Sequence, residues 1–160
     1  MMSPAPCQKI PMFNVREATS DDLGSLGVLF DAYRQFYALA PDEPAARDYI
    51  RERLSARDSV ILVASSADST LQGFCQLYPS RCSLLGAPIY ILYDLYVAPA
   101  ARGSGAGKAL MLAATERARR DGKARMELQT ARTNQTARAL YQSLGWQLDE
   151  TFLTYTLPLR

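Results

Sequence analysis

The stretch that decides the fold runs over residues 92–110 and reads Leu92-Tyr93-Asp94-Leu95-Tyr96-Val97-Ala98-Pro99-Ala100-Ala101-Arg102-Gly103-Ser104-Gly105-Ala106-Gly107-Lys108-Ala109-Leu110. It joins an apolar strand to a helix through a loop that carries three glycines and two cations. Glycines permit positive φ angles, so successive N–H groups can turn inward, and the helix that follows adds the positive end of its dipole. The loop is therefore predicted to hold a diphosphate.

Two common phosphate-binding motifs do not match this loop. A Walker A loop needs glycine where Arg102 stands, and Ser or Thr where Ala109 follows Lys108. A dinucleotide-binding fingerprint that used Gly103 and Gly105 would need a third glycine at position 108, and it would also need an N-terminal βαβ unit. Both alternatives are rejected on these counts.

The run from Arg102 to Gly107, preceded by Val97-Ala98-Pro99, resembles the acetyl-CoA signature of the GNAT acetyltransferase superfamily, (Arg/Gln)-x-x-Gly-x-(Gly/Ala). Residues 134–146 are similar to a second segment of that family, Asn-x-x-Ala-x-x-Leu-Tyr-x-x-x-Gly-(Phe/Trp). The resemblance covers about residues 13–157, and residues 90–97 resemble the spermidine/spermine and thialysine acetyltransferases. It implies an enzyme that transfers acetyl from acetyl-CoA to a primary amine by direct attack in a ternary complex.

The resemblance also implies which residues bind acetyl-CoA. The backbone at the strand end would hold the pantetheine, through Leu95, Tyr96 and Val97. The loop would hold the pyrophosphate, through Arg102, Gly103, Ser104, Gly105, Ala106, Gly107 and Lys108. The second motif would contribute Asn134, Ala137 and Tyr141, and the alternative role of Asn134 is the N-cap of its helix.

The two catalytic candidates are Tyr141 and Asp94. An alkylammonium has a pKa near roughly 10, so its proton must leave before the amine attacks. Tyr141 matches the residue expected to protonate the departing thiolate, with core packing as the alternative. Asp94 would act as base through water or orient the ammonium, and a structural carboxylate is the alternative. The chain has no histidine, which excludes His-based triads and His general bases.

The amine acceptor would lie among aromatic side chains. Tyr33, Phe36 and Tyr37 fall in the first predicted helix, and Tyr93 occupies the place where related enzymes carry Glu. Aromatic faces bind cations, which favours a polyamine-like or amino-acid-like acceptor. As an alternative, Tyr33, Phe36 and Tyr37 would pack in the core at helical spacing. The alternative acceptor is a protein lysine or N-terminus. The alternative function of the whole chain is a non-catalytic acyl-CoA-binding module.

Composition narrows the remaining classes of function. Lys and Arg number 18 against 16 Asp and Glu, so a net charge of +2 predicts neither nucleic acid nor membrane as a partner. Three cysteines without CxxC spacing predict neither a disulfide framework nor a zinc site, and no metal is expected. No signal peptide or bilayer-spanning stretch is recognised, so a cytoplasmic protein is expected.

The element pattern predicts an α+β fold, a GNAT-like mixed sheet of about six to seven strands flanked by about four helices. A flexible lead-in is expected over 1–12 and a single domain over 13–160. The last strand, Phe152 to Leu157, would complete the sheet or pair with another subunit in a homodimer. Strands are expected at 13–18, 60–64, 71–78, 89–97, 126–130 and 152–157, with helices ending near 37, 57, 121 and 143.

Overall fold

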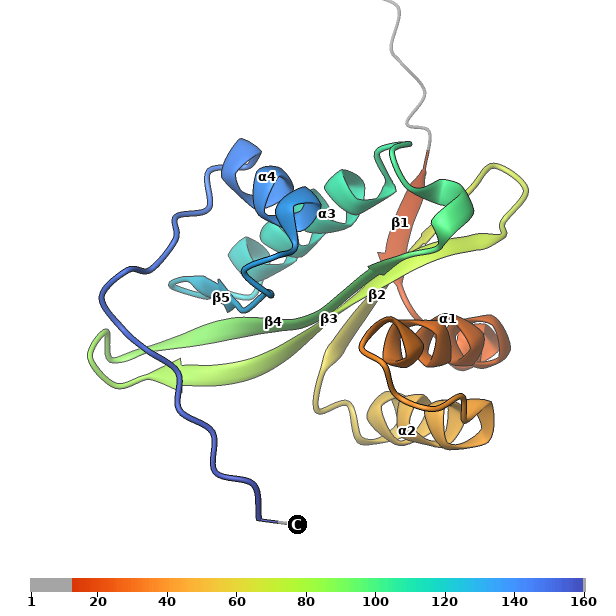
Figure 1. Ribbon diagram of the computed structural model, residues 1–160, viewed down its shortest axis with the longest axis horizontal. Coiled ribbons are helices and arrows are strands. Elements are labelled where there is room, and N and C mark those ends of the chain that lie inside the picture. Colours follow the sequence, from red (N-terminus) through yellow and green to blue (C-terminus); the bar gives the residue numbers. More distant parts are fainter. Residues whose placement is uncertain (1–12, 160) are drawn as a thin grey trace, which may run out of the picture. The chain divides into compact units, whose positions relative to one another are not determined.

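The computed structural model describes residues 13–159, so the lead-in predicted for 1–12 lies outside the described residues. Four α-helices and five strands follow the predicted order within this part of the chain (Figure 1). The strands are β1 (Asn14–Glu17), β2 (Val60–Ser65), β3 (Leu71–Cys82), β4 (Ala87–Val97) and β5 (Met126–Leu128). The helices are α1 (Leu23–Phe36), α2 (Glu43–Ala56), α3 (Ala106–Arg120) and α4 (Gln135–Ser143), with 3₁₀ turns η1 (Ser20–Asp22) and η2 (Pro99–Ala101).

The five strands form one sheet in the order β1-β2-β3-β4-β5. The first four strands pair antiparallel, and β5 pairs parallel to β4. The α+β class and the mixed sheet are therefore confirmed, and the strands predicted at 60–64 and 71–78 form the antiparallel pair β2 and β3. The described residues hold five strands, so the prediction of six to seven was too high.

The strand predicted over Phe152 to Leu157 is not formed. Residues 152–159 have no strand assignment, and the side chains of Phe152 and Leu157 are 75% and 80% exposed. Apolar residues such as Tyr155 suit a pleated surface, but a strand exists only through its ladder to a neighbour. Among the described residues, the last strand of the sheet, β5, ends at Leu128, so the apolar pattern of residues 152–157 does not by itself make a strand.

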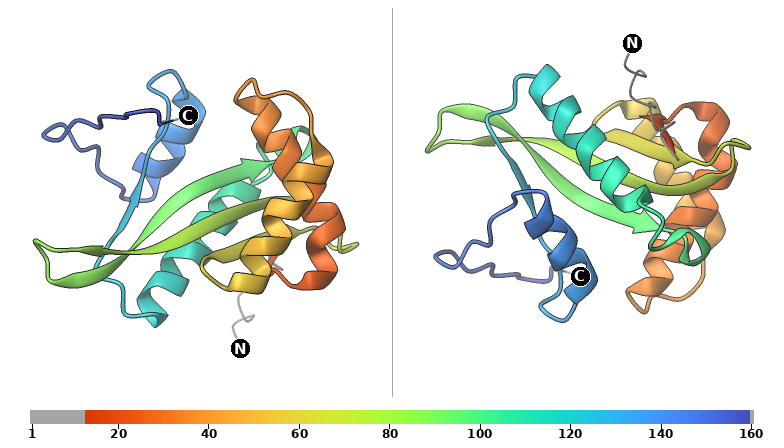
Figure 2. Two further views of the ribbon diagram at one scale, coloured as in Figure 1. Left: turned by 90° about the horizontal axis from the view of Figure 1, so that it is seen from below. Right: turned by 90° about the horizontal axis from the view of Figure 1, so that it is seen from above.

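The chain divides into two compact units, of which the structure describes 13–129 and 130–159. In the first unit, α1 and α2 cover one face of the sheet and α3 covers the other (Figure 2). The second unit holds α4 and the segment that follows it. The helix ends at Ser143, and Gly145 just beyond it has a φ angle of 84°.

Each face of the sheet carries its own apolar layer. Under α1 and α2, Leu26, Ile50 and Phe74 are completely buried, and under α3 the same is true of Leu110 and Met111. Fully burying a side chain of this size contributes about 1.5–3 kcal/mol. Helix α3 therefore packs on the sheet through Leu110 and Met111.

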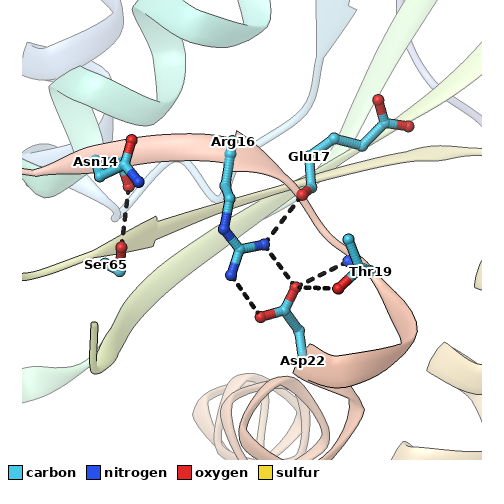
Figure 3. A network of polar contacts seen from close by, with 6 residues as sticks. All are labelled: Asn14, Arg16, Glu17, Thr19, Asp22 and Ser65. Atoms are coloured by element: carbon cyan, nitrogen blue, oxygen red, sulfur yellow. Dashed lines mark hydrogen bonds and ion pairs between the residues drawn. The ribbon is translucent and has the colours of Figure 1, made fainter.

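A charged network joins the first strand to the start of α1 (Figure 3). Arg16 on β1 donates from Nη1 and Nη2 to the two carboxylate oxygens of Asp22, at 2.7 and 2.8 Å. The Thr19 amide donates to the same carboxylate at 2.8 Å, which closes a capping box at η1. The hydrogen bonds from Arg16 lower the pKa of Asp22, so this carboxylate is charged at neutral pH.

Candidate functional site

The glycine loop has the geometry that its sequence predicts. Gly103 and Gly105 adopt φ angles of 75° and 98°, which L side chains rarely tolerate. A Cβ at either glycine would meet no atom of the described residues within 4 Å, so the loop is open on that side. The loop therefore leaves room for a ligand beside its two glycines.

The first turn of α3 has backbone N–H donors that the helix itself does not use. The Ala109 amide donates to the Gly105 carbonyl at 2.9 Å, which is the first hydrogen bond of the helix. The amides of Ala106, Gly107 and Lys108 precede it and belong to the first turn, whose N–H groups have no partner inside a helix. Such donors, together with the helix dipole, bind phosphate oxygens. The loop fits a diphosphate.

The Arg102 side chain extends away from the loop toward aromatic rings. Its Nε donates to the Val97 carbonyl at 3.1 Å, at the end of β4. Its guanidinium lies 5.8 Å from the ring centroid of Phe36 and 5.7 Å from that of Tyr96. The guanidinium thus connects the C-terminal end of α1 to the end of β4, and each cation–π contact at an exposed site contributes about 0.5–1 kcal/mol.

Strand β4 has a β-bulge at Tyr93, the residue immediately before Asp94. Gln76 is paired with Asp94 and the next residue of β3, Leu77, with Leu92, so Tyr93 is the extra residue. Its side chain is 67% exposed, and its ring lies edge-on to Tyr78 at 5.6 Å. Bulges of this kind re-aim side chains. Here the bulge leaves an exposed tyrosine beside a buried carboxylate.

Asp94 is buried, with 8% of its surface exposed, on the sheet face that α1 and α2 cover. Burial raises the pKa of Asp94, and a hydrogen bond with the Tyr33 side chain opposes that rise. The carboxyl group is therefore shifted toward the range in which it can accept a proton from a substrate.

The aromatic residues predicted for the acceptor side have two different environments. The Tyr33 ring is packed, at 5.9 Å from Phe74 and 6.1 Å from Tyr96, as the core interpretation requires. Phe36 and Tyr37 are 55% and 50% exposed, so the core interpretation is wrong for them. The ring of Tyr37 lies 5.2 Å from that of Tyr33, which makes a continuous aromatic row from the half-buried Tyr33 to the exposed end of α1.

Two polar features beside this row were missed from the sequence. Asp31 accepts hydrogen bonds from the amide of Asp42 at 2.9 Å and from Gln35 Nε2 at 2.9 Å, which ties α1 to the start of α2. On the sheet face, the hydroxyls of Tyr49 on α2 and Tyr78 on β3 share a hydrogen bond. The Gln35 contact is local to α1, but Asp31 and Asp42 are 11 positions apart and Tyr49 and Tyr78 are 29 positions apart, so no local motif marks those two contacts.

The second unit contains the remaining predicted residues. Asn134 accepts a hydrogen bond from the Ala137 amide at 3.2 Å, which confirms its role as the N-cap of α4. Tyr141 is half-buried, with its ring 6.2 Å from that of Trp146. The structure therefore gathers Asn134, Ala137 and Tyr141 on one short helix and the other predicted site residues in the first unit.

Two negative findings concern the described part of the chain, residues 13–159. No group of three or more His, Cys, Asp or Glu side chains within it is arranged to hold a metal ion. Within the same range, every helix is too short or too polar to cross a membrane.

Comparison with known proteins adds a family match. A model of the acetyltransferase (GNAT) family matches residues 27–146. The protein named "uncharacterized N-acetyltransferase YhfO" of Bacillus subtilis is 40% identical over 144 residues, which cover 90% of this chain and 96% of that protein. A mycothiol acetyltransferase of Saccharomonospora viridis is 32% identical over 117 residues, which cover 71% of this chain and 38% of that protein.

A solved structure is also similar. The crystal structure of a probable acetyltransferase superimposes with a TM-score of 0.86 at 36% sequence identity. The match covers 92% of this chain and 98% of the other.

Proposed function

Because this chain belongs to the GNAT family and is an acetyl-CoA-dependent N-acetyltransferase, we propose that its acceptor is the primary amine of a small molecule, polyamine-like or amino-acid-like. The observation that carries this proposal is one buried carboxylate, Asp94, next to a row of aromatic side chains that reaches the surface. The relative named for mycothiol is named for a small molecule, which supports the same class of acceptor.

Aromatic rings and a carboxylate together recognise an ammonium group. Phe36, Tyr37 and Tyr93 each expose half or more of their surface. Tyr37 and Tyr93 have ring faces to offer a cation, whereas the Phe36 ring already has the Arg102 guanidinium over it. Asp94 provides the negative charge at the inner end of the row, where Tyr33 holds its carboxylate. A protonated amine would be drawn toward Asp94 by charge and retained by cation–π contacts with the exposed rings.

Asp94 is proposed as the group that takes the proton from the amine, directly or through one water. Its burial raises its pKa, which makes the carboxylate a better proton acceptor than an exposed Asp. The freed amine then attacks the acetyl group directly. Tyr141 is proposed to donate the hydroxyl proton to the departing sulfur, and its half-buried ring against Trp146 limits the positions its hydroxyl can take.

Acetyl-CoA is proposed to bind along the end of β4 and over the glycine loop. The backbone of Leu95, Tyr96 and Val97 would bond the pantetheine, and the first-turn amides of α3 the pyrophosphate. The exposed Lys108 side chain adds a cation beside these amides. Arg102 would act partly through the contacts that hold Val97 and Tyr96 in place.

The test of the acceptor class is a comparison of substrates. Release of CoA is measured at fixed acetyl-CoA with a panel of polyamines and amino acids, and in parallel with peptides that offer an N-terminus or a lysine. We expect saturable turnover with members of the small-amine panel and little with the peptides. Faster turnover with peptides than with any small amine would reverse the assignment in favour of a protein acceptor.

The same assay tests the residues. Asp94→Asn keeps the shape of the side chain and is expected to lower kcat by about 10²–10⁴-fold, the usual contribution of a general base. Tyr93→Ala is expected to raise KM for the amine and leave KM for acetyl-CoA unchanged. Leu84→Ala, at a hairpin position that is 92% exposed, is the control and should change neither.

A further inference from the structure

Gln76 is a buried polar side chain with an unused hydrogen-bonding atom. It lies on β3 and has no exposed surface. Its Nε2 donates to the hydroxyl of Ser59 at 2.8 Å, and its Oε1 has no hydrogen-bond partner among the described residues. Buried side-chain oxygens of this kind nearly always have a partner, so an orphan indicates an interaction that another state of the protein completes.

The register of the sheet places Gln76 next to Asp94. The two residues are directly opposite each other across the β3–β4 ladder, immediately before the bulge at Tyr93. Residues opposite each other in an antiparallel pair share one face, with Cβ atoms about 4.5–5.5 Å apart. Gln76 is fully buried and Asp94 retains 8% exposure, and the Tyr33 side chain hydrogen-bonds with the Asp94 carboxyl group.

We propose that Gln76 is a positioning residue for Asp94, whose amide orients the carboxyl group and can serve both of its protonation states. This inference rests on the role of Asp94 in the proposed function. When Asp94 is neutral, its O–H donates to Oε1 of Gln76 while Nε2 donates to Ser59. When Asp94 is charged, the amide turns over, so that Nε2 donates to the carboxylate and the Ser59 hydroxyl donates to Oε1.

Ser59 makes this exchange possible because a hydroxyl is both a donor and an acceptor. It can therefore satisfy the end of the amide that faces it in either orientation. Gln76 has matching versatility, since its amide carries an acceptor at one end and two donors at the other. Together, Gln76 and Ser59 can present an acceptor to Asp94 when its carboxyl group is neutral and a donor when it is charged.

The other groups around Asp94 do not provide this support. Tyr33 on α1 hydrogen-bonds with it, and the charge of Asp94 contributes to raising the pKa of Tyr78 and Cys75 on β3. Burial raises the pKa of Cys75 to about 12 and also raises that of Tyr78, so both are neutral at physiological pH. On α2, Tyr49 bonds to Tyr78, and Arg53 lies over the Tyr49 ring, one contact further away.

Loss of the amide should shift the titration of Asp94 in a definite direction. Hydrogen bonds to a charged group are roughly twice as strong as those to a neutral one, so the amide favours the carboxylate over the acid. Without the amide, the buried carboxylate loses a hydrogen-bond donor that stabilises its negative charge. The pKa of Asp94 should therefore rise in Gln76→Leu, and the proton-accepting form should appear only at higher pH.

The test is a direct titration of the Asp94 carboxyl carbon by ¹³C NMR, assigned with Asp94→Asn, in the protein without substrate. In Gln76→Leu we expect its pKa to rise by about one unit, and we expect the acid limb of the pH profile of kcat/KM to move to higher pH by the same amount. Gln72→Leu is the matched control on the same strand, because the Gln72 amide bonds to Ser66 instead, and it should leave the titration unchanged.

The outcomes separate this inference from the proposed function. An unchanged Asp94 titration in folded Gln76→Leu overturns the role of Gln76. A shifted titration with an unshifted pH profile of kcat/KM supports the role of Gln76 and rejects Asp94 as the base. Gln76→Met, which keeps the unbranched shape, is measured alongside in case the leucine variant does not fold, and it should show the same shift.

Discussion

Gly73 lies where two strands approach too closely for any side chain. A Cβ built at this position would lie 2.6 Å from the Tyr96 carbonyl oxygen and 3.3 Å from the Val97 Cα. Carbon and carbonyl oxygen normally approach to about 3.3 Å, so Gly73→Ala creates an overlap of about 0.7 Å. The obstructing atoms are backbone and cannot rotate away. We therefore expect β3 and β4 to separate at the end of β4.

The expected cost follows from this overlap. Overpacking by one methyl group costs about 1–3 kcal/mol, and a loss of about 2 kcal/mol lowers Tm by about 4–8 °C for a chain of this length. The displaced backbone at Tyr96 and Val97 belongs to the strand end that we propose holds the pantetheine. KM for acetyl-CoA should therefore rise in the same variant, with little change in KM for the amine.

The assay pairs thermal unfolding with initial rates at varied acetyl-CoA, and Gly24→Ala is the control. Gly24 is on α1, and a Cβ there would meet no atom of the described residues within 4 Å. Alanine favours a helix over glycine by up to about 1 kcal/mol, so this variant should melt at the same or a higher temperature. A Gly73→Ala protein with wild-type Tm and wild-type KM for acetyl-CoA would refute the close-approach argument.

Two further predictions concern turnover and stability. Tyr141→Phe should lower kcat, because the hydroxyl that donates the proton is lost. The affinity for acetyl-CoA, measured by calorimetry, should stay unchanged. Full activity of this variant would mean that Tyr141 only packs. Asp22→Asn should cost about 2 kcal/mol at pH 7, since it breaks charge-assisted bonds to Arg16. The pKa of Asp22 is lowered by folding, so its stabilisation is present above the ordinary Asp value near about 3.9 and is lost as pH falls through the folded pKa. The Tm difference between wild type and Asp22→Asn should therefore be large at pH 7 and small at pH 2, and an equal difference at both would contradict the charge-based account.

The features that the sequence predicted well are those decided by neighbouring residues. Gly103 and Gly105 have the positive φ angles expected of the loop, and Asn134 caps the helix that it precedes. The apolar run of residues 89–97 forms the strand that was predicted there, β4. Each of these outcomes depends on conformational preferences within a few residues, which composition and spacing express directly.

The features that the sequence did not reveal depend on pairing across long intervals. The same reasoning overestimated the sheet at Phe152 to Leu157, because the apolar pattern of that segment says nothing about a partner strand. It also left the role of Asp94 open, because a carboxylate on an apolar strand faces substrate or backbone donors according to register. The structure shows the register itself, in which Asp94 lies opposite Gln76 immediately before the bulge at Tyr93.

The sequence by itself thus determined the family, the order of the helices and strands through α4, and the loop that fits a diphosphate, since local backbone preferences and motif spacing carry that information. Only the tertiary structure decided that Asp94 is buried beside Tyr33, that Gln76 lies opposite it with an unpaired oxygen, and that Gly73 meets the Tyr96 carbonyl. The physical reason is that burial and cross-strand register arise from packing between distant segments, and no single segment encodes them.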